Sequence, residues 1–231
     1  MLRAMFGEPP RKDEGLLLEA VQAIRKYMNT VTPASGQTPQ ERRFAIWCQS
    51  FLRALDELEQ SQFAANRFGL KVTKLYTDEM SAEELEDYHR HLYYYNNALI
   101  RVFAVLDKIG HFVNERFALQ TERIKSRFSY FTVLRHMHKN ELFADLEQRL
   151  YDLKMRYKEP LSRLRNQRNM EIHTINADLL DELMKAAEAK YGERVRIGTE
   201  DIRENLHDLE QGCEMALRAV ATVFRYVPRR P

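Results

Sequence analysis

One uninterrupted pattern of apolar and aromatic side chains constrains the fold more than any other feature of the sequence. From Leu85 to Val113 such residues recur at alternating spacings of three and four, at positions 85, 88, 92, 95, 99, 102, 106, 109 and 113. This rhythm places them along one narrow stripe of an α-helix, which is typical of a long helix packed lengthwise against a partner. Ser81 and Glu84 precede the stripe as a capping box and predict where the helix begins.

The last part of the chain repeats this rhythm. Apolar or small residues stand at positions 202, 206, 209, 213, 216, 220 and 223, and Thr199 is the predicted N-cap of their helix. Two long stripes in one chain need partners for both. We therefore predict an all-α fold, a helical bundle of long antiparallel helices with extra short helices.

The other elements follow from shorter patterns. An amphipathic helix is predicted over about residues 14–28, and Thr38 with Glu41 forms a capping box that opens a helix to about residue 66. Residues 68–77 allow either a short strand or an irregular crossover.

The segment before the second stripe has its own signals. A helix is predicted over Asn140 to Tyr157, and Pro160 is expected to break it. Asn176 is expected to cap a short helix through Lys190, while residues 194–197 are too few to assign.

Composition narrows the class of protein. The 231 residues are 44% hydrophobic and 30% charged, with few Gly and Pro, so we predict a single helical domain over 1–231. Within it, N-terminal helices of about residues 14–66 are expected to pack on a core of about residues 82–226. The net charge of +2 is too small to predict a nucleic-acid or membrane partner, so any basic site has to be local. No apolar run is long enough to span a membrane, and Cys48 and Cys213 fit buried thiols, so we expect a cytoplasmic protein.

Residues 158–173 interrupt their own apolar pattern. Leu161 and Leu164 predict further apolar side chains near positions 167 and 168, where the sequence has Gln167 and Arg168. If this gap faces inward, its polar groups cost on the order of a few kcal/mol unless they find partners. We expect a partner chain, water or a ligand to occupy the gap.

The same region is basic. Two acids, Asp152 and Glu159, accompany seven cations: Arg149, Lys154, Arg156, Lys158, Arg163, Arg165 and Arg168. Guanidinium groups are natural bidentate partners of phosphate oxygens. Two interpretations stay open, a solvated basic face and a phosphate-binding surface.

Arg168, Asn169 and His173 form the pattern R-N-x-x-x-H, and this resembles the motif of the HEPN superfamily of small helical-bundle proteins. The resemblance covers about residues 82–226, with motif identity at those three residues. It implies an HEPN-like bundle that acts as a homodimer on RNA or a nucleotide, in many members as a metal-independent endoribonuclease without cofactor or metal. Toxin-antitoxin or defence roles are among those that it implies. Toxins paired with nucleotidyltransferases carry Tyr two residues after the His, whereas this chain has Ile175.

The resemblance also implies roles for single residues. His173 would act as the acid or base, Arg168 would offset the charge of the scissile phosphate, and Asn169 would orient the imidazole or the phosphate. The product would be a 2′,3′-cyclic phosphate end. Further phosphate contacts are expected from Arg165, Arg163 and Lys158.

Several alternatives stay open beside this hypothesis. Asp107 and His111 either orient residues of the site through hydrogen bonds or form a local hydrogen-bonded pair. A metal site built from His91, His111 and His138 can be named but has no supporting spacing. Of the run Tyr93 to Tyr95, only Tyr95 belongs to the apolar stripe, so the rings serve packing or RNA stacking. Finally, the chain fits a non-catalytic helical module that binds a nucleotide, RNA or a protein partner.

Overall fold

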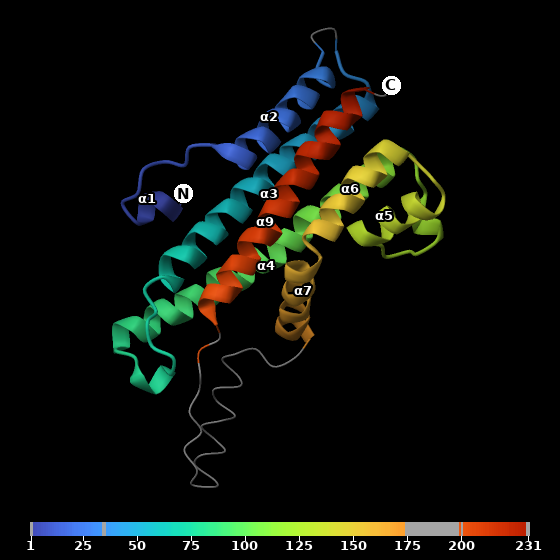
Figure 1. Cartoon of the computed structure of the whole chain (residues 1–231). Helices are drawn as coiled ribbons and strands as arrows, with labels where there is room; N and C mark the ends of the chain where they lie inside the picture. Colours follow the sequence, from blue (N-terminus) through green and yellow to red (C-terminus); the bar gives the residue numbers. More distant parts are fainter. Residues whose placement is uncertain (1, 34–35, 174–198, 200, 230–231) are drawn as a thin grey trace. The chain divides into compact units, whose positions relative to one another are not determined.

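The computed structural model describes residues 2–33, 36–173, 199 and 201–229, and the side chains of 171–173 and 229 lie outside the description. Every regular element in these ranges is helical, which confirms the all-α prediction. The helices are α1 (Leu2–Met5), α2 (Gly15–Thr30), α3 (Pro39–Gly69), α4 (Ala82–Arg116), α5 (Tyr130–Lys139), α6 (Ala144–Arg156), α7 (Lys158–His173) and α9 (Ile202–Tyr226) (Figure 1). Three short 3-10 turns, η1 (Thr77–Glu79), η2 (Thr121–Arg123) and η3 (Val227–Arg229), complete the described part.

The chain forms two compact units. Unit 1 comprises Met1–Gln60, Arg101–Lys158 and Gly212–Pro231, and unit 2 comprises Ser61–Ile100 and Glu159–Gln211. Helices α3, α4 and α9 each contribute residues to both units. The single domain, with N-terminal helices packed on a later core, stays a prediction.

Both long stripes lie where the sequence placed them. In α4, seven of the nine stripe residues are buried, and Leu85 and Leu92 are half-buried. In α9, all stripe residues after Ile202 are buried. The stripes are therefore the packing faces of the two helices.

Side-chain pairs fix the direction of α4 relative to α3 in unit 1. The Trp47 Nε1 atom donates to Glu115 Oε2 at 3.0 Å, and the Lys108 Nζ atom donates to Ser50 Oγ at 2.6 Å. Residue numbers rise along α3 as they fall along α4. These two helices are therefore antiparallel, as predicted.

Aromatic rings form the centre of unit 1. Phe112 is fully buried, and its ring centroid lies 5.0 Å from that of Phe224 and 5.9 Å from that of Phe51. The rings of Phe44 and Tyr27 follow at 6.0 and 6.1 Å. Edge-to-face and stacked pairs of this kind add to the burial of large apolar area, so α2, α3, α4 and α9 share one aromatic core.

The predicted capping boxes have different outcomes. At the start of α3, the Thr38 N–H donates to Glu41 Oε2 at 2.8 Å and the Glu41 N–H donates to Thr38 Oγ1 at 3.2 Å, which confirms that box. At the start of α4, Ser81 accepts the Glu84 N–H at 3.2 Å, but Glu84 Oε1 accepts the Thr73 N–H at 2.6 Å instead of closing the box. This last hydrogen bond is the main cause of the lowered pKa of Glu84. Residues 70–76 are therefore an irregular connection that Glu84 holds.

Two predicted helix starts were wrong. Asp201, and not Thr199, caps α9, because its Oδ1 atom accepts the backbone N–H groups of residues 203 and 204 at 3.1 and 3.0 Å. The backbone N–H of Thr199 donates to the Leu75 carbonyl at 2.7 Å. Helix α6 begins at Ala144, because Glu141 and Phe143 have positive φ angles of 54° and 51°.

The helix end predicted before Pro160 is confirmed, because α6 ends at Arg156. Helix α6 is capped by Tyr157, and Pro160 stands in the first turn of α7, where its missing N–H leaves no hydrogen bond unmade. Helix α5 was not predicted as an element. The helix expected after Asn176 and residues 194–197 lie outside the described residues.

Candidate functional site

The polar stretch of the sequence forms the second half of α7, within unit 2. Leu161 and Leu164 are buried, but no described side chain from Arg165 to Met170 is. The apolar stripe of α7 therefore ends after its second turn, as the sequence indicated. Polar contacts have to hold the rest of the helix.

Gln167 makes the first of these contacts. The Tyr95 hydroxyl on α4 donates to Gln167 Oε1 at 2.6 Å, and Gln167 Nε2 donates to Asn205 Oδ1 on α9 at 2.6 Å. Two side chains of the protein itself thus satisfy the amide. The expectation that a ligand, water or partner chain fills the gap was wrong at this position.

Arg163 makes the second contact, one turn earlier. Its Nε and Nη2 atoms donate to the two carboxylate oxygens of Asp208 on α9, each at 2.6 Å. The Asp208 side chain is 1% exposed and that of Arg163 is 47% exposed. The hydrogen bonds to Asp208 raise the pKa of Arg163, which stays cationic. One edge of the guanidinium is therefore occupied, and a bidentate phosphate there would have to displace Asp208.

Arg168 and Asn169 stand beyond these contacts. The Arg168 Nη2 atom donates to Asn169 Oδ1 at 2.8 Å, while Asn169 is exposed and Arg168 is half-buried. Because a guanidinium only donates, it must face the amide oxygen, and the Asn169 NH₂ group points elsewhere as a donor. His173 ends α7, and its side chain lies outside the described residues.

The other predicted phosphate contacts are placed at the surface. Arg165 is exposed in unit 2, and Lys158 is exposed at the first position of α7, where unit 1 ends. Their contact with RNA stays a prediction.

Asp107 and His111 have local partners in unit 1. The Asp107 Oδ1 atom accepts the backbone N–H of Tyr130 at 3.0 Å, so it caps the start of α5. The His111 ring lies 4.4 Å from the ring of Phe128, between centroids. Each side chain thus contacts another residue of unit 1, and their role in orienting the residues of the site stays a prediction.

The histidines proposed for a metal also have local partners. His91 is buried in unit 2, where its Nδ1–H donates to the Ala65 carbonyl at 2.9 Å and burial lowers its pKa. His138 Nδ1 lies 3.1 Å from Glu147 Oε1 in unit 1. Among the described residues, no three His, Cys, Asp or Glu side chains gather closely enough to hold a metal ion.

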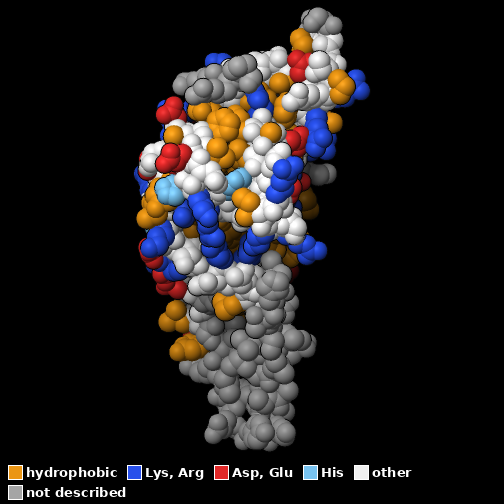
Figure 2. All heavy atoms as spheres, turned by 90° about the vertical axis from the view of Figure 1, so that its right-hand side faces the viewer, with side chains coloured by type: hydrophobic (Ala, Val, Ile, Leu, Met, Phe, Trp, Pro, Cys, Tyr) orange, Lys and Arg blue, Asp and Glu red, His pale blue; other side chains and the backbone are white. Residues whose placement is uncertain are grey.

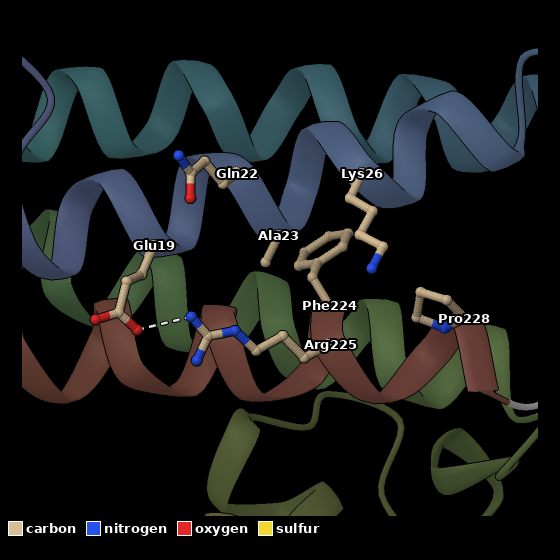
Figure 3. Close-up of a pocket in the computed structure, with 7 residues that line it drawn as sticks. All are labelled: Glu19, Gln22, Ala23, Lys26, Phe224, Arg225 and Pro228. Atoms are coloured by element: carbon tan, nitrogen blue, oxygen red, sulfur yellow. Dashed lines mark hydrogen bonds and ion pairs between the residues drawn. The ribbon is translucent and has the colours of Figure 1, made fainter.

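A pocket of about 390 Å³ lies in unit 1 between α2 and the end of α9 (Figure 3). Buried Ala23 and Phe224 form its base, and an ion pair between Arg225 Nη2 and Glu19 Oε2, 2.7 Å long, lies beside it. None of the candidate site residues lines it. We assign it no role.

Two contact residues were missed from the sequence, Asn205 and Asp208. They flank the apolar stripe of α9 three residues apart, and their partners Gln167 and Arg163 are four apart on α7 in the opposite order. Such matched polar positions on two antiparallel helices are the signal that would have indicated the pairing.

Comparisons with known proteins place the chain in a family. A model of the HEPN_Cthe2314-like HEPN family matches residues 47–228, which is most of the chain and begins upstream of the expected core boundary near residue 82. No curated protein and no solved structure gave a match. In the described part of the chain, no helix combines the length and the apolar character needed to cross a bilayer. The all-α architecture, the motif on α7 and this match agree, and the chain belongs to the HEPN superfamily, in its HEPN_Cthe2314-like family.

Proposed function

We propose that the protein binds RNA at the second half of α7 and cleaves it without a metal ion. The observation that carries the proposal is the hydrogen bond from Arg168 to Asn169, which holds a guanidinium beside an amide NH₂ group, one residue beyond Gln167 on the helix. Membership of the HEPN superfamily supports a function on RNA or nucleotides.

The proposed reaction is a transesterification within the RNA strand. Arg168 and the Asn169 amide donate to the non-bridging oxygens of the scissile phosphate and stabilise its developing charge. His173 stands four residues after Asn169, hence on the same helical face, and takes the proton of the ribose 2′-OH. The 2′ oxygen bonds to phosphorus, the bond to the 5′ oxygen breaks, and that oxygen takes a proton. The products are a 2′,3′-cyclic phosphate and a 5′-hydroxyl.

Neighbouring cations take lesser roles. Arg165 and Lys158 are exposed and are proposed to contact flanking phosphates. Arg163 is proposed to act mainly through Asp208, by holding α7 against α9. The motif is proposed to act in a homodimer, in which two copies of α7 contribute to one site, as the family resemblance implies.

The test is incubation of the purified protein with structured RNA in EDTA. Wild type is expected to cleave and to leave cyclic phosphate ends, while His173→Ala and Arg168→Ala are expected to lose activity by about 100-fold or more. Arg203→Ala is the matched control, since Arg203 is an exposed arginine of α9 in the same unit. Cleavage that survives in His173→Ala, or that needs a divalent metal, would contradict the proposed mechanism.

A second function is favoured by the way α7 is braced. Gln167 and Arg163 are both engaged by other helices, which suits a rigid binding face as well as a catalytic one. In this alternative the protein is a non-catalytic RNA-binding module. Tight binding of RNA without cleavage, weakened by Arg168→Ala but not by Arg203→Ala, would establish it.

A further inference from the structure

A second concentration of positive charge lies in unit 1, apart from the motif in the sequence. Between Glu122 and Glu141 the chain has no acidic residue, but it has two histidines and five cations: Arg123, Lys125, Arg127, Arg135 and Lys139. We refer to residues 123–139 as the basic segment. It covers the end of η2, the connection that follows it and the whole of α5.

The cations of the basic segment are exposed and largely unused. Within the described residues, Lys125, Arg127, Arg135 and Lys139 have neither an ion pair nor a side-chain hydrogen bond, whereas six arginines elsewhere in unit 1 have carboxylate partners: Arg3, Arg11, Arg43, Arg101, Arg218 and Arg225. On the face that Figure 2 turns to the viewer, Lys and Arg side chains gather with His among them. Charge left without intramolecular partners is available to an anionic partner.

Contacts with α4 and with buried Thr121 hold the backbone of the basic segment in place. Thr121 is fully buried, and its N–H donates to Asn114 Oδ1 at 2.9 Å. Its Oγ1 atom lies 3.1 Å from His136 Nδ1 on α5. At Gly110, a Cβ would lie 2.8 Å from the Tyr130 Cα, so glycine permits the close approach of α5 to α4. A segment anchored in this way loses little conformational freedom when it binds.

Planar side chains lie among these cations. His138 is 63% exposed, and its ring stacks on that of Tyr151 with 5.4 Å between centroids and 8° between planes. The Lys154 Nζ atom lies 5.0 Å from the Tyr151 ring centroid. In the connection before α5, the half-buried ring of Phe128 contacts exposed His111. Cations interleaved with accessible rings are the combination that binds single-stranded nucleic acid, since phosphates pair with the cations and bases stack on the rings.

We infer that the basic segment, with the ring pair of His138 and Tyr151, is a binding surface for single-stranded RNA. The choice of RNA rests on the proposed function, whereas the choice of a single strand rests on the exposed His138 ring, which a duplex with stacked bases does not use. Affinity on this surface comes from phosphate contacts and stacking, without sequence readout.

The first experiment compares two sets of four substitutions. The test set is Lys125→Gln, Arg127→Gln, Arg135→Gln and Lys139→Gln. The control set is Arg25→Gln, Lys26→Gln, Arg42→Gln and Arg53→Gln, which removes four exposed cations from α2 and α3 of the same unit and changes the net charge equally. Binding of a labelled single-stranded RNA of about 20 nucleotides is followed by fluorescence anisotropy as salt is raised.

The test set is expected to bind at least about tenfold more weakly than wild type, with a slope of log affinity against log salt reduced by about 3, because each phosphate contact to a single strand contributes about 0.7. The control set is expected to stay within about twofold of wild type. Equal losses in both sets, or no loss in the test set, would overturn the inference. Circular dichroism verifies that each set is folded.

The second experiment tests stacking. His138→Ala is expected to weaken single-stranded RNA binding about fivefold, and inorganic polyphosphate or anionic vesicles are expected to compete poorly at equal phosphate concentration. Competition as strong as that of RNA would overturn the inference in favour of a general polyanion surface. The same binding assay separates this surface from the motif. RNA binding by the test set at the wild-type level, with binding lost in Arg168→Ala, would leave the proposed function standing and this inference refuted.

Discussion

Phe112 and Gln167 show how differently the two units are held together. Phe112 is fully buried in unit 1 and contacts a set of other rings, whereas half-buried Gln167 in unit 2 reaches Tyr95 and Asn205 through hydrogen bonds. Ring contacts are favourable over a range of orientations, but hydrogen bonds need specific distances and angles. Apolar area therefore stabilises unit 1, while in unit 2 directional polar pairs determine which side of α7 faces its neighbours.

This distinction bears directly on the candidate site. Arg163 and Gln167 are engaged by α9, and in consequence Arg168 and Asn169 are presented on the remaining part of the helix. The buried Leu161 and Leu164 fix one side of the first two turns of α7, but from Arg165 to Met170 no buried apolar side chain limits the freedom of the helix to rotate. Polar pairs restrict that freedom, so the placement of the motif depends on them.

The largest effect is expected when the aromatic core of unit 1 is opened. Phe112→Ala should lower the free energy of unfolding by about 3 to 5 kcal/mol, because it removes a fully buried ring and leaves a cavity. Denaturant titration followed by the fluorescence of Trp47 measures it, since Trp47 is the sole tryptophan and its ring lies 6.1 Å from that of Phe112. Tyr93→Ala is the matched control on α4, where the side chain is 66% exposed. Equal losses from both substitutions would contradict the comparison.

Breaking the ion pair of unit 2 is expected to have the next largest effect. Arg163→Ala leaves the buried Asp208 carboxylate without its partner and should lower the melting temperature by an amount on the order of 5 °C. The double variant Arg163→Ala, Asp208→Leu should recover much of that loss, because the buried charge is then absent. Thermal unfolding followed by circular dichroism measures both. A double variant less stable than the single one would show that Asp208 has favourable contacts of another kind.

Much of the fold was predictable because long helices carry their own periodicity. The stripe from Leu85 to Val113 determines one face of α4 over many turns, and no competing pattern interrupts it. The start of α6 was less predictable. Leu142 continues the helical spacing, but the positive φ angles of Glu141 and Phe143 arise from packing that local sequence does not encode.

The candidate site was predictable only in part. The polar gap at Gln167 was visible in the sequence, but its partners Tyr95 and Asn205 are far from it along the chain, and a side chain on one helix does not indicate which other helix will satisfy it. For the same reason Arg163 was predicted to contact phosphate, because no residue near it in the sequence indicated its partner Asp208. Local charge patterns indicate chemistry, whereas partners depend on tertiary structure.

A substitution at Gln167 sharpens the comparison between the units. If apolar packing governed unit 2 as it governs unit 1, Gln167→Leu would be stabilising. We expect the opposite, a loss of about 1 to 2 kcal/mol, because the Tyr95 hydroxyl and the Asn205 amide would each lose a partner. Gln167→Glu should be close to neutral, since Tyr95 can still donate to it and the Asn205 amide can turn to donate. Denaturant unfolding of both variants, with exposed Gln49→Leu as control, distinguishes the two cases.

The smallest effect is expected from pH, and it again separates the units. Burial lowers the pKa of His91 from its ordinary value of 6.5, so below that pH the unfolded chain binds a proton that the folded chain resists. Above that pH, His91 is neutral in both states and has no effect on stability. The free energy of unfolding should fall as pH drops below about 6.5, until the pKa of His91 in the folded state is passed. His91→Asn retains a donor for the Ala65 carbonyl but does not titrate, and it should flatten this dependence between about pH 7 and 5, whereas exposed His89→Asn should not.

Glu214, whose pKa is lowered mainly by its hydrogen bond from Arg218, affects stability only below its ordinary pKa of 4.5, outside that range. A pH dependence that persisted unchanged in His91→Asn would have to come from another group, and buried His91 would then not be the part of unit 2 that responds to pH.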